Sequence, residues 1–350
     1  MTQRLRLSHS RVKRSVVLIA ALLGIGSWFI SRPQVTRVRA QSTSPAFQSF
    51  EAPQIHPLAI TPDGTRLLAC NTHNNSLSVF QLMCGTPTLS IEIPTGLQPV
   101  SVAARNNGEA WVANWLSNTI SVVDLSAGNV VRTIDVGYQP TDVVFAGQTT
   151  QMAFVCVAGT AQVLVFDPNA PTTSPQVINI RGKQPRSLAT DPSGARVFVS
   201  VFESGNQTTI VPATEVAREG GLPKPQPKKA KGLPAAPATS LIVKWNGSAW
   251  ADQTGNTKWN QVIPYTLADV DLVVLDASKA AVTISEEVHG VGTHIGNAVL
   301  DPATEKLYVA NTDSLNNVRF LPNLKGHFAS NRVSIINFGS SSPAVTAVDI

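Results

Sequence analysis

Cysteine is scarce in this sequence of 350 residues, which contains only three. None of them stands in a Cys-x-x-Cys-His pattern, so the chain attaches no haem covalently through that motif. Cys70 and Cys156 fall on expected strands, whereas Cys84 falls in a turn. Cys84 lies roughly six residues, at about 3.3 Å per residue, from the position expected opposite Cys70, which is too far for a disulfide. We therefore expect free and mostly buried thiols.

Sequence motifs of catalysis are also missing. No Gly-x-Ser-x-Gly pattern is present, so a serine hydrolase has no support. Gly290-Val291-Gly292 is too short for a phosphate-binding loop. His289 and His294 form a pair, but no third ligand stands nearby at a metal-binding spacing, and the glycines between them suit a loop. We predict no catalytic, cofactor-binding or metal-binding residue in this chain.

Acidic residues are absent from residues 1–40, where eight cations stand. This local surplus produces the formal net charge of +5. The rest of the chain holds 19 of the 27 basic residues against all 22 acidic ones, a balance of −3. Four of those basic residues sit in one proline-rich segment without acids (Lys224, Lys228, Lys229 and Lys231). The remaining surface is therefore acidic, which is the wrong sign for nucleic acid, and we exclude nucleic acid as a partner.

Residues 1–40 have the layout of an export signal. A basic start precedes the apolar run Ser15–Ile30, and Val38-Arg39-Ala40 fits a small-x-small cleavage site. The run is short for a spanning helix of about 20 residues, yet an uncleaved membrane anchor is the alternative. Either way we expect an exported protein of the periplasm or cell surface that contacts the membrane only through this segment. Residues 41–53 form a polar lead-in.

A unit of about 40 residues repeats along residues 54–350. Its clearest copy, residues 97–137, contains four β-branched or apolar runs separated by Asn, Gly and Ser turns. Gln-Pro pairs start successive units at residues 98, 139 and 184, which are 41 and 45 positions apart. Four strands per unit at this period predict an all-β protein, a β-propeller with about five visible blades. A generic β-sandwich predicts no such period.

The second strands of the units share a short pattern: Trp-Val-Ala-Asn at 111–114, Phe-Val-Cys-Val at 154–157, Phe-Val-Ser-Val at 198–201 and Tyr-Val-Ala-Asn at 308–311. Followed by a polar turn and a strand such as Ile120–Asp124, this pattern resembles the YVTN family of β-propeller proteins over residues 54–211 and 268–350. The resemblance implies an exported or surface-associated protein, distantly similar to lactonase-type propellers. The two Phe-Val copies lack the terminal Asn.

The resemblance also concerns the size of the protein. The family's propellers commonly have seven blades, and some are joined to c-type cytochrome modules. We therefore expect these five units to be the front part of a larger propeller. Any haem would then belong to a carboxyl-terminal extension, and this chain itself is expected to hold no cofactor.

Two insertions interrupt the repeat. Residues 213–267, in unit 4, begin as a Pro/Lys-rich segment and continue as a hairpin around Asn246-Gly247 that carries Trp245, Trp250 and Trp259. Residues 314–331 interrupt unit 5. The tryptophans have two interpretations, because they could grip a sugar or peptide, or could hold the hairpin against the parent domain.

Both insertions fall in the loop between strands two and three of a blade. In a propeller this loop shares one face with the connection to the next blade, so the insertions and the Gln-Pro starts should lie together. Function usually resides in loops carried on a rigid scaffold. The predicted binding face comprises His73, Gln98, Trp115, Gln139, Gln184, Arg186, Glu203, Trp245, Trp250, Trp259, His294 and Asp313.

These observations favour an exported, non-catalytic binding scaffold over the other classes. Its partner would be a protein, a peptide, an envelope polymer or a redox domain in the same polypeptide. The first alternative is an enzyme, either a lactonase-like hydrolase or the propeller part of a periplasmic redox protein. It requires an acid/base or metal set around the central channel, which the sequence does not supply. The second alternative is a structural cell-surface protein.

Overall fold

The structure is a computed structural model that describes residues 54–83, 86–224, 231–232, 234, 238–267, 269–319, 321–338 and 343–350. The expected export segment, the lead-in and Cys84 lie outside the described residues. No helix in the described ranges combines the length and the hydropathy that crossing a bilayer requires.

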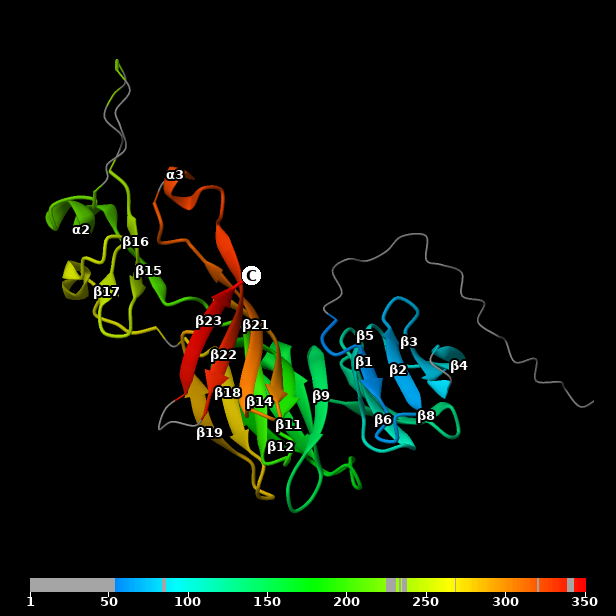
Figure 1. The fold of residues 1–350 in the computed structure, drawn as a ribbon. Coiled ribbons are helices and arrows are strands. Elements are labelled where there is room, and N and C mark those ends of the chain that lie inside the picture. Colours follow the sequence, from blue (N-terminus) through cyan, green and yellow to red (C-terminus); the bar gives the residue numbers. More distant parts are fainter. Residues whose placement is uncertain are drawn as a thin grey trace, which may run out of the picture. The chain divides into compact units, whose positions relative to one another are not determined.

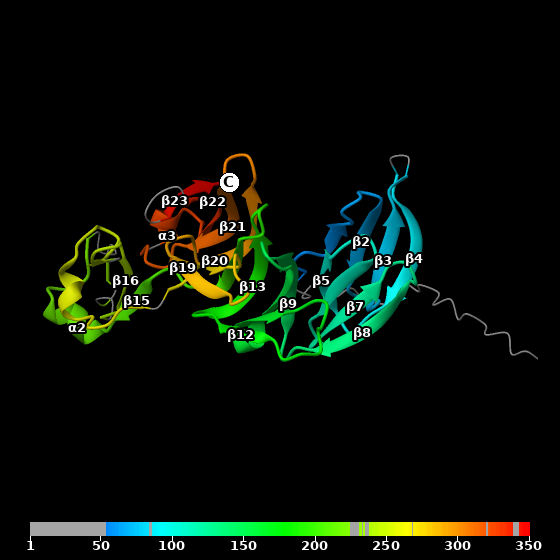
Figure 2. The ribbon, with the colours of Figure 1, turned by 90° about the horizontal axis from the view of Figure 1, so that it is seen from below.

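Five four-stranded antiparallel sheets follow one another along the described chain (Figures 1 and 2). Blade 1 contains β1 (Leu58–Ile60), β2 (Arg66–Asn71), β3 (Ser76–Gln81) and β4 (Thr88–Pro94). Blade 2 contains β5 (Pro99–Ala104), β6 (Glu109–Asn114), β7 (Thr119–Asp124) and β8 (Asn129–Asp135). Blade 3 contains β9 (Pro140–Ala146), β10 (Met152–Val157), β11 (Gln162–Phe166) and β12 (Gln176–Asn179), with the short 3-10 helix η2 (Ala158–Thr160) after β10.

The last two blades have the same plan, with additions. Blade 4 contains β13 (Lys183–Thr190), β14 (Arg196–Glu203), β18 (Leu272–Asp276) and β19 (Thr283–Val288). Blade 5 contains β20 (His294–Asp301), β21 (Lys306–Ser314), β22 (Ala329–Asn337) and β23 (Ala344–Asp349), with α3 (Leu321–Leu324) between β21 and β22. The predicted fold class, an all-β propeller with four strands per repeat, is confirmed.

A strand that lies between two blades can supply side chains to both of them, because successive residues point to opposite faces. In β6, Trp111 and Ala113 pack into the core shared with blade 3. Ala110 and Val112 pack into the core shared with blade 1. Both cores exclude water, so the blades depend on one another for burial of their apolar surface.

The glutamines that start three blades adopt the left-handed backbone conformation, with φ of 53° at Gln98, 62° at Gln139 and 57° at Gln184. Asn75 and Asn118, in the turns of the preceding blades, accept hydrogen bonds from the backbone N–H groups of Gln98 and Gln139, at 2.8 and 3.1 Å. These bonds tie each blade start to the blade before it. The recurring Gln-Pro pairs are therefore part of the frame that joins blades.

Asp142 of β9 joins four blades. Its buried carboxylate accepts hydrogen bonds from the Ser101 hydroxyl of blade 2 at 2.5 Å and the Leu188 N–H of blade 4 at 2.7 Å. His56, just before blade 1, contacts it through Nδ1 at 2.8 Å. Burial alone would lower the pKa of His56, but the hydrogen bond and the charge of Asp142 together raise it. One buried polar centre thus ties together the innermost strands β5, β9 and β13 and the segment that precedes β1.

The inserted segment in blade 4 forms a small sheet of β15 (Thr208–Val211), β16 (Leu241–Trp245) and β17 (Trp250–Ala251), with α2 (Ala213–Arg218) and η3 (Lys258–Gln261). Because β15 pairs with β16, the inserted sheet begins ahead of residue 213. The Asn246-Gly247 turn closes the β16–β17 hairpin, with a bond from Asn246 N–H to the Ala249 carbonyl at 3.0 Å. Gly247 has a φ of 96°, which favours glycine at this turn.

Candidate functional site

A pocket of about 550 Å³ lies where the inserted sheet meets the loops of blades 4 and 5. We call it the insertion pocket. Its walls come from three parts of the chain: the start of the inserted sheet, its hairpin, and the loops around strands β18 to β22. The lining residues are Asn206, Gln207, Lys244, Trp245, Asn246, Gly247, Asp269, Asp271, His289, Gly290, Gly292, Asp313 and Arg332.

Two carboxylates stand in the segment that leads from the insertion back into blade 4. Asp269 and Asp271 are both buried. Asp271 accepts hydrogen bonds from the Val291 N–H and the Ser204 hydroxyl, but desolvation dominates and raises its pKa to about 6. Desolvation also raises the pKa of Asp269, against the opposing effects of a backbone N–H and of nearby His289 and Lys244. The two acids therefore hold protons more readily than exposed ones.

His289 is exposed at the rim of the pocket, and its ring orientation is fixed. Nδ1 lies within hydrogen-bond distance of the Asp269 backbone carbonyl. A carbonyl oxygen only accepts, so Nδ1 carries the proton. In the neutral ring Nε2 then holds a lone pair, which can accept a hydrogen bond from a ligand.

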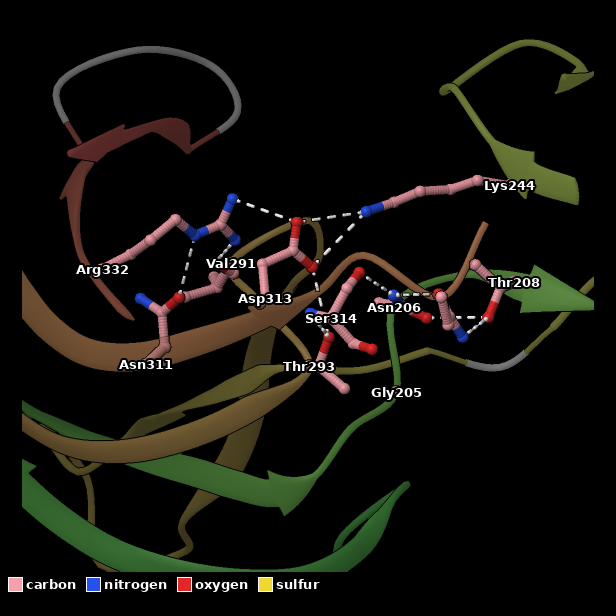
Figure 3. A network of polar contacts seen from close by, with 12 residues as sticks. Gly205, Asn206, Thr208, Lys244, Val291, Thr293, Asn311, Asp313, Ser314 and Arg332 are labelled. Atoms are coloured by element: carbon pink, nitrogen blue, oxygen red, sulfur yellow. Dashed lines mark hydrogen bonds and ion pairs between the residues drawn. The ribbon is translucent and has the colours of Figure 1, made fainter. Parts of the chain in front are cut away.

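Asp313, at the end of β21, holds two cations from different elements (Figure 3). Lys244 of the inserted sheet reaches it at 3.3 Å, and Arg332 of β22 reaches it at 3.2 Å. The Thr293 hydroxyl donates to the same carboxylate at 3.2 Å. Arg332 also donates to the Val291 carbonyl at 2.8 Å. This network connects the insertion to blade 5 across the pocket.

A second polar contact holds the base of the insertion. The Asn206 side-chain amide donates to the Ser314 carbonyl at 2.9 Å and to the Asn316 side chain at 3.0 Å (Figure 3). Its oxygen accepts from the Thr208 hydroxyl at 2.8 Å. The two insertions, one in each blade, therefore contact each other at this end of the molecule. Asn206, which lines the pocket, is therefore held by hydrogen bonds rather than by packing alone.

The three tryptophans of the insertion serve different purposes. Trp250 and Trp259 are buried in the insertion's own core, and Trp259 donates its indole N–H to Asp252 at 3.0 Å. They hold the hairpin together and have little surface left for a ligand. Trp245 is half-buried, meets Trp250 edge to face with ring centroids 5.5 Å apart, and lines the pocket. Of the three, Trp245 is the one placed to contact a ligand.

The other predicted binding-face residues fall into separate groups. Asp313 joins Trp245 in the insertion pocket. Gln139, Gln184 and Glu203 line a shallower hollow of about 360 Å³ between blades 3 and 4.

Arg186 and His294 meet on the Phe202 ring, at 4.3 and 5.3 Å from its centroid. Gln98 and Trp115 are joined by a bond from Trp115 N–H to the Gln98 carbonyl at 2.9 Å, and His73 is exposed in the β2–β3 turn. The binding face predicted from the sequence therefore includes part of the lining of the insertion pocket, and its other residues are scattered over neighbouring surfaces.

Several lining residues were not singled out as binding residues from the sequence: Asn206, Gln207, Lys244, Asp269, Asp271, His289 and Arg332. Most of them precede or follow a strand at an irregular point, where the repeat gives no register. One signal was available, since Asp269 and Asp271 flank the return from the insertion into β18. His289 was considered only as half of a metal pair with His294. Within the described residues no group of three or more His, Cys, Asp or Glu side chains is arranged to hold a metal ion.

The central channel differs in character from the insertion pocket. It is a cavity of about 430 Å³ lined by residues of the innermost strands β1, β5, β9, β13 and β20. Most of the lining is aliphatic, and His56 and Thr190 are its polar members. Asp142, beside it, is buried and already accepts hydrogen bonds from several donors. The described channel residues supply no acid/base pair.

Comparisons with known proteins agree with this architecture. Residues 55–159 match the family model described as the SMP-30/Gluconolactonase/LRE-like region. The search of curated proteins finds no match.

Solved structures match a larger share of this chain than the family model does, but at low sequence identity. Hydrazine synthase of Kuenenia stuttgartiensis is similar at a TM-score of 0.56 and 15% identity, over 88% of this chain and 69% of that one. A candidate 6-phosphogluconolactonase from Bacteroides uniformis is similar at a TM-score of 0.51 and 14% identity, over 83% of this chain and 69% of that one. A protein of unknown function from Desulfotomaculum acetoxidans is similar at a TM-score of 0.52 and 12% identity, over 86% of this chain and 74% of that one. At these identities the likeness concerns the fold, and the chain is a β-propeller whose first blades match a gluconolactonase-like region.

Proposed function

We propose that the chain is an exported propeller of the YVTN type that binds a neutral, hydroxyl-rich ligand in the insertion pocket. The ligand would be a saccharide, either free or at the end of an envelope polymer. The single observation that supports this proposal most is the pocket itself, which lies between the hairpin of the first insertion and the loops of blades 4 and 5. Recognition sites commonly combine a concave shape with a few placed polar groups.

The charges of the pocket favour a neutral ligand. Lys244 and Arg332 are both paired with Asp313, and the acids Asp269 and Asp271 have raised pKa values. An anionic ligand would meet two cations whose partner is already present, together with two acids that would oppose its charge. A hydroxyl group suits the site better, because it can donate to Nε2 of His289 and accept from the partly exposed ammonium of Lys244.

Trp245 adds an aromatic surface beside these polar groups. An aromatic ring presents an apolar face, and the C–H face of a sugar ring is apolar as well, so the two can pack together. The hydroxyl groups at the sugar's edge then remain free to bond with the polar lining. This combination separates a saccharide from a peptide, whose charged termini or side chains would need an unpaired counter-charge.

A binding experiment tests the proposal. Thermal-shift and calorimetric titrations of the purified chain would use glucose, N-acetylglucosamine and cellobiose, with tetra-alanine as the peptide probe. We expect saturable binding of a saccharide, weakened about tenfold by Trp245→Ala, since about 1.4 kcal/mol corresponds to a factor of ten. His289→Ala should weaken it similarly. The matched control is His327→Ala, which removes a side chain outside the pocket.

A hydrolase is the second candidate, and the match of residues 55–159 to a gluconolactonase-like region favours it. Opening a lactone ring requires a positioned base that activates water. His289 could act as such a base in the insertion pocket, whereas the described channel lining is mainly aliphatic. Assay of gluconolactone hydrolysis separates the two functions. The binding proposal predicts a rate equal to that in buffer, with and without added divalent cations.

A further inference from the structure

The hollow of about 360 Å³ between blades 3 and 4 lies beside the segment that leads into the first insertion. We call it the blade-start hollow, because the residues at the starts of these two blades line it. Its larger side chains are Tyr138, Gln139, Lys183, Gln184 and Glu203. The proposed site in the insertion pocket makes no use of these side chains, yet their chemistry is similar.

Tyr138 presents an aromatic ring in the blade-start hollow. The residue is 58% exposed, but its ring is supported from below by the backbone of Gly159. A Cβ at residue 159 would come 2.9 Å from Cγ of Tyr138, so a residue other than glycine would displace the ring. The Gly159 N–H also donates to the Tyr138 carbonyl at 3.1 Å. The open part of this supported ring can pack against the apolar face of a sugar ring.

Two glutamines add hydrogen-bonding groups to the hollow. Gln139 and Gln184 start blades 3 and 4, and neither of their side-chain amides forms a hydrogen bond within the part of the chain that the structure describes. Each amide offers an acceptor oxygen and two donor hydrogens, which suit the hydroxyl groups of a neutral sugar. Lys183 and Glu203 are cross-strand partners, so their opposite charges balance each other.

A very short stretch of chain separates the blade-start hollow from the insertion pocket. Glu203 lines the first and Asn206 lines the second, three positions later. Even a fully extended chain would place these two Cα atoms at most about 11 Å apart, at about 3.6 Å per residue. The stretch is also held in place, since the Ser204 hydroxyl donates to the Gly292 carbonyl at 3.2 Å.

Gly205 lies next to Asn206, between the two hollows (Figure 3). It is exposed, and it offers only backbone to a ligand that passes over it. Its φ of 88° favours glycine, and a Cβ here would come 2.8 Å from Oδ1 of Asp269 at the edge of the insertion pocket. The step from one hollow to the other is therefore free of side chains at this residue.

From these contacts we propose that the two hollows are subsites of one elongated site that binds an oligosaccharide. The elongated site rests on the proposed function, since saccharide binding in the insertion pocket is its first half. One end of the ligand packs on Trp245, its middle crosses Gly205, and its other end packs on Tyr138. A few linked sugar rings span this distance. Their hydroxyl groups bond with His289 at one end and with the two glutamine amides at the other.

The dependence of affinity on ligand length tests this proposal. Calorimetric titrations of the purified chain would compare cellobiose with cellotetraose, and the disaccharide with the tetrasaccharide of N-acetylglucosamine. We expect the tetrasaccharide of the recognised series to bind about tenfold more tightly than its disaccharide, because the second subsite adds contacts without a second association step. Tyr138→Ala should reduce this length gain about fivefold, whereas Tyr138→Phe keeps the ring and should retain it.

Two further variants separate this effect from others. Trp245→Ala should weaken binding of both lengths, because both occupy the insertion pocket. Phe328→Ala is the matched control, since it removes an aromatic side chain that is 66% exposed and lies outside both hollows. It should leave the length gain unchanged. Circular dichroism checks that Tyr138→Ala is folded, which is expected because Tyr138 is largely exposed.

The possible failures are distinguishable. A tetrasaccharide that binds no more tightly than its disaccharide would overturn the elongated site, while weakening of both by Trp245→Ala would still support the proposed function. A length gain that persists in folded Tyr138→Ala would place the additional sugars elsewhere and would also overturn it. Absence of saturable binding by every saccharide would refute the proposed function and the elongated site together.

Discussion

Removal of the Asp142 carboxylate should weaken the whole blade assembly. The side chain is buried, and it accepts hydrogen bonds from Ser101 and Leu188, two residues of neighbouring blades that are themselves buried. Asp142→Ala leaves the hydroxyl and the N–H without an acceptor in a site that excludes water. It also removes the partner of His56.

The expected magnitude follows from these contacts. An unsatisfied buried donor costs about 1–3 kcal/mol, and two of them cost about 2–6 kcal/mol. Removal of one member of a buried charged contact is typically worth about 3–5 kcal/mol. We therefore expect Asp142→Ala to lower the free energy of unfolding by about 3–5 kcal/mol. Asp142→Asn keeps the shape and one acceptor oxygen, so its cost should be smaller.

Urea unfolding followed by tryptophan fluorescence and circular dichroism measures this effect. Asp135→Ala is the matched control, because Asp135 is an exposed acid on β8 and its loss should change stability by less than about 0.5 kcal/mol. Ser101→Ala should be non-additive with Asp142→Ala, since the two residues share one bond. A loss below about 1 kcal/mol for Asp142→Ala would refute the assignment of this carboxylate as the centre that joins the blades.

The remaining predictions concern pH and the pocket wall. The pKa of His56 is raised in the folded chain. The contribution of His56 to stability is therefore complete below its unfolded pKa of about 6.5, and it is lost as pH rises through the folded pKa. In urea titrations His56→Gln should remove this pH dependence. The pKa of Asp271 is raised to about 6, so the unfolding free energy should fall as pH rises from about 4 to about 6, and Asp271→Asn should flatten that slope. A slope unchanged by either variant would contradict the assignment of that residue. Gly292→Ala would place a Cβ 2.9 Å from the Thr312 carbonyl, so the variant should lower the melting temperature and weaken saccharide binding, whereas Gly255→Ala meets open space and strains only its turn.

The sequence was sufficient for the repeated part of the fold. Alternation of apolar and polar residues within each strand, together with turns at a period near 40, defines a blade before any contact is known. The strand expected over residues 109–114 is β6 at Glu109–Asn114, for example. Repetition makes this possible because every copy contains the same pattern of strands and turns, so each copy supports the same assignment.

The pairing of residues across strands was predictable only approximately. Cys70 was expected opposite the neighbourhood of Ser78, and the structure pairs it with Leu77. The conclusion about its chemistry is unaffected, because Cys70 and Cys156 are both buried, free thiols. Burial raises the pKa of both, to about 12 for Cys156 and higher still for Cys70, so neither is a reactive thiolate.

The candidate site was harder to predict because its residues stand where the repeat is broken. Lys244, Asp269 and Arg332 come from an inserted hairpin, a returning loop and the third strand of blade 5, and no period relates them. Their proximity depends on tertiary contacts such as the Lys244–Asp313–Arg332 network. The sequence predicted Trp245 on the binding face, but it predicted Trp250 and Trp259 there as well, although both are core residues. Only the fold distinguishes an aromatic ring that packs from one that is free to bind.

Hydrogen–deuterium exchange with and without the saccharide that gives the largest thermal shift tests the central claim most directly, namely that ligand binding belongs to the interruptions of the repeat. The account predicts that protection on binding appears at residues 244–247 and 289–292, which line the insertion pocket. Protection confined to the channel strands, at residues 102–104 and 298–300, would contradict it and would move the binding site to the centre of the propeller.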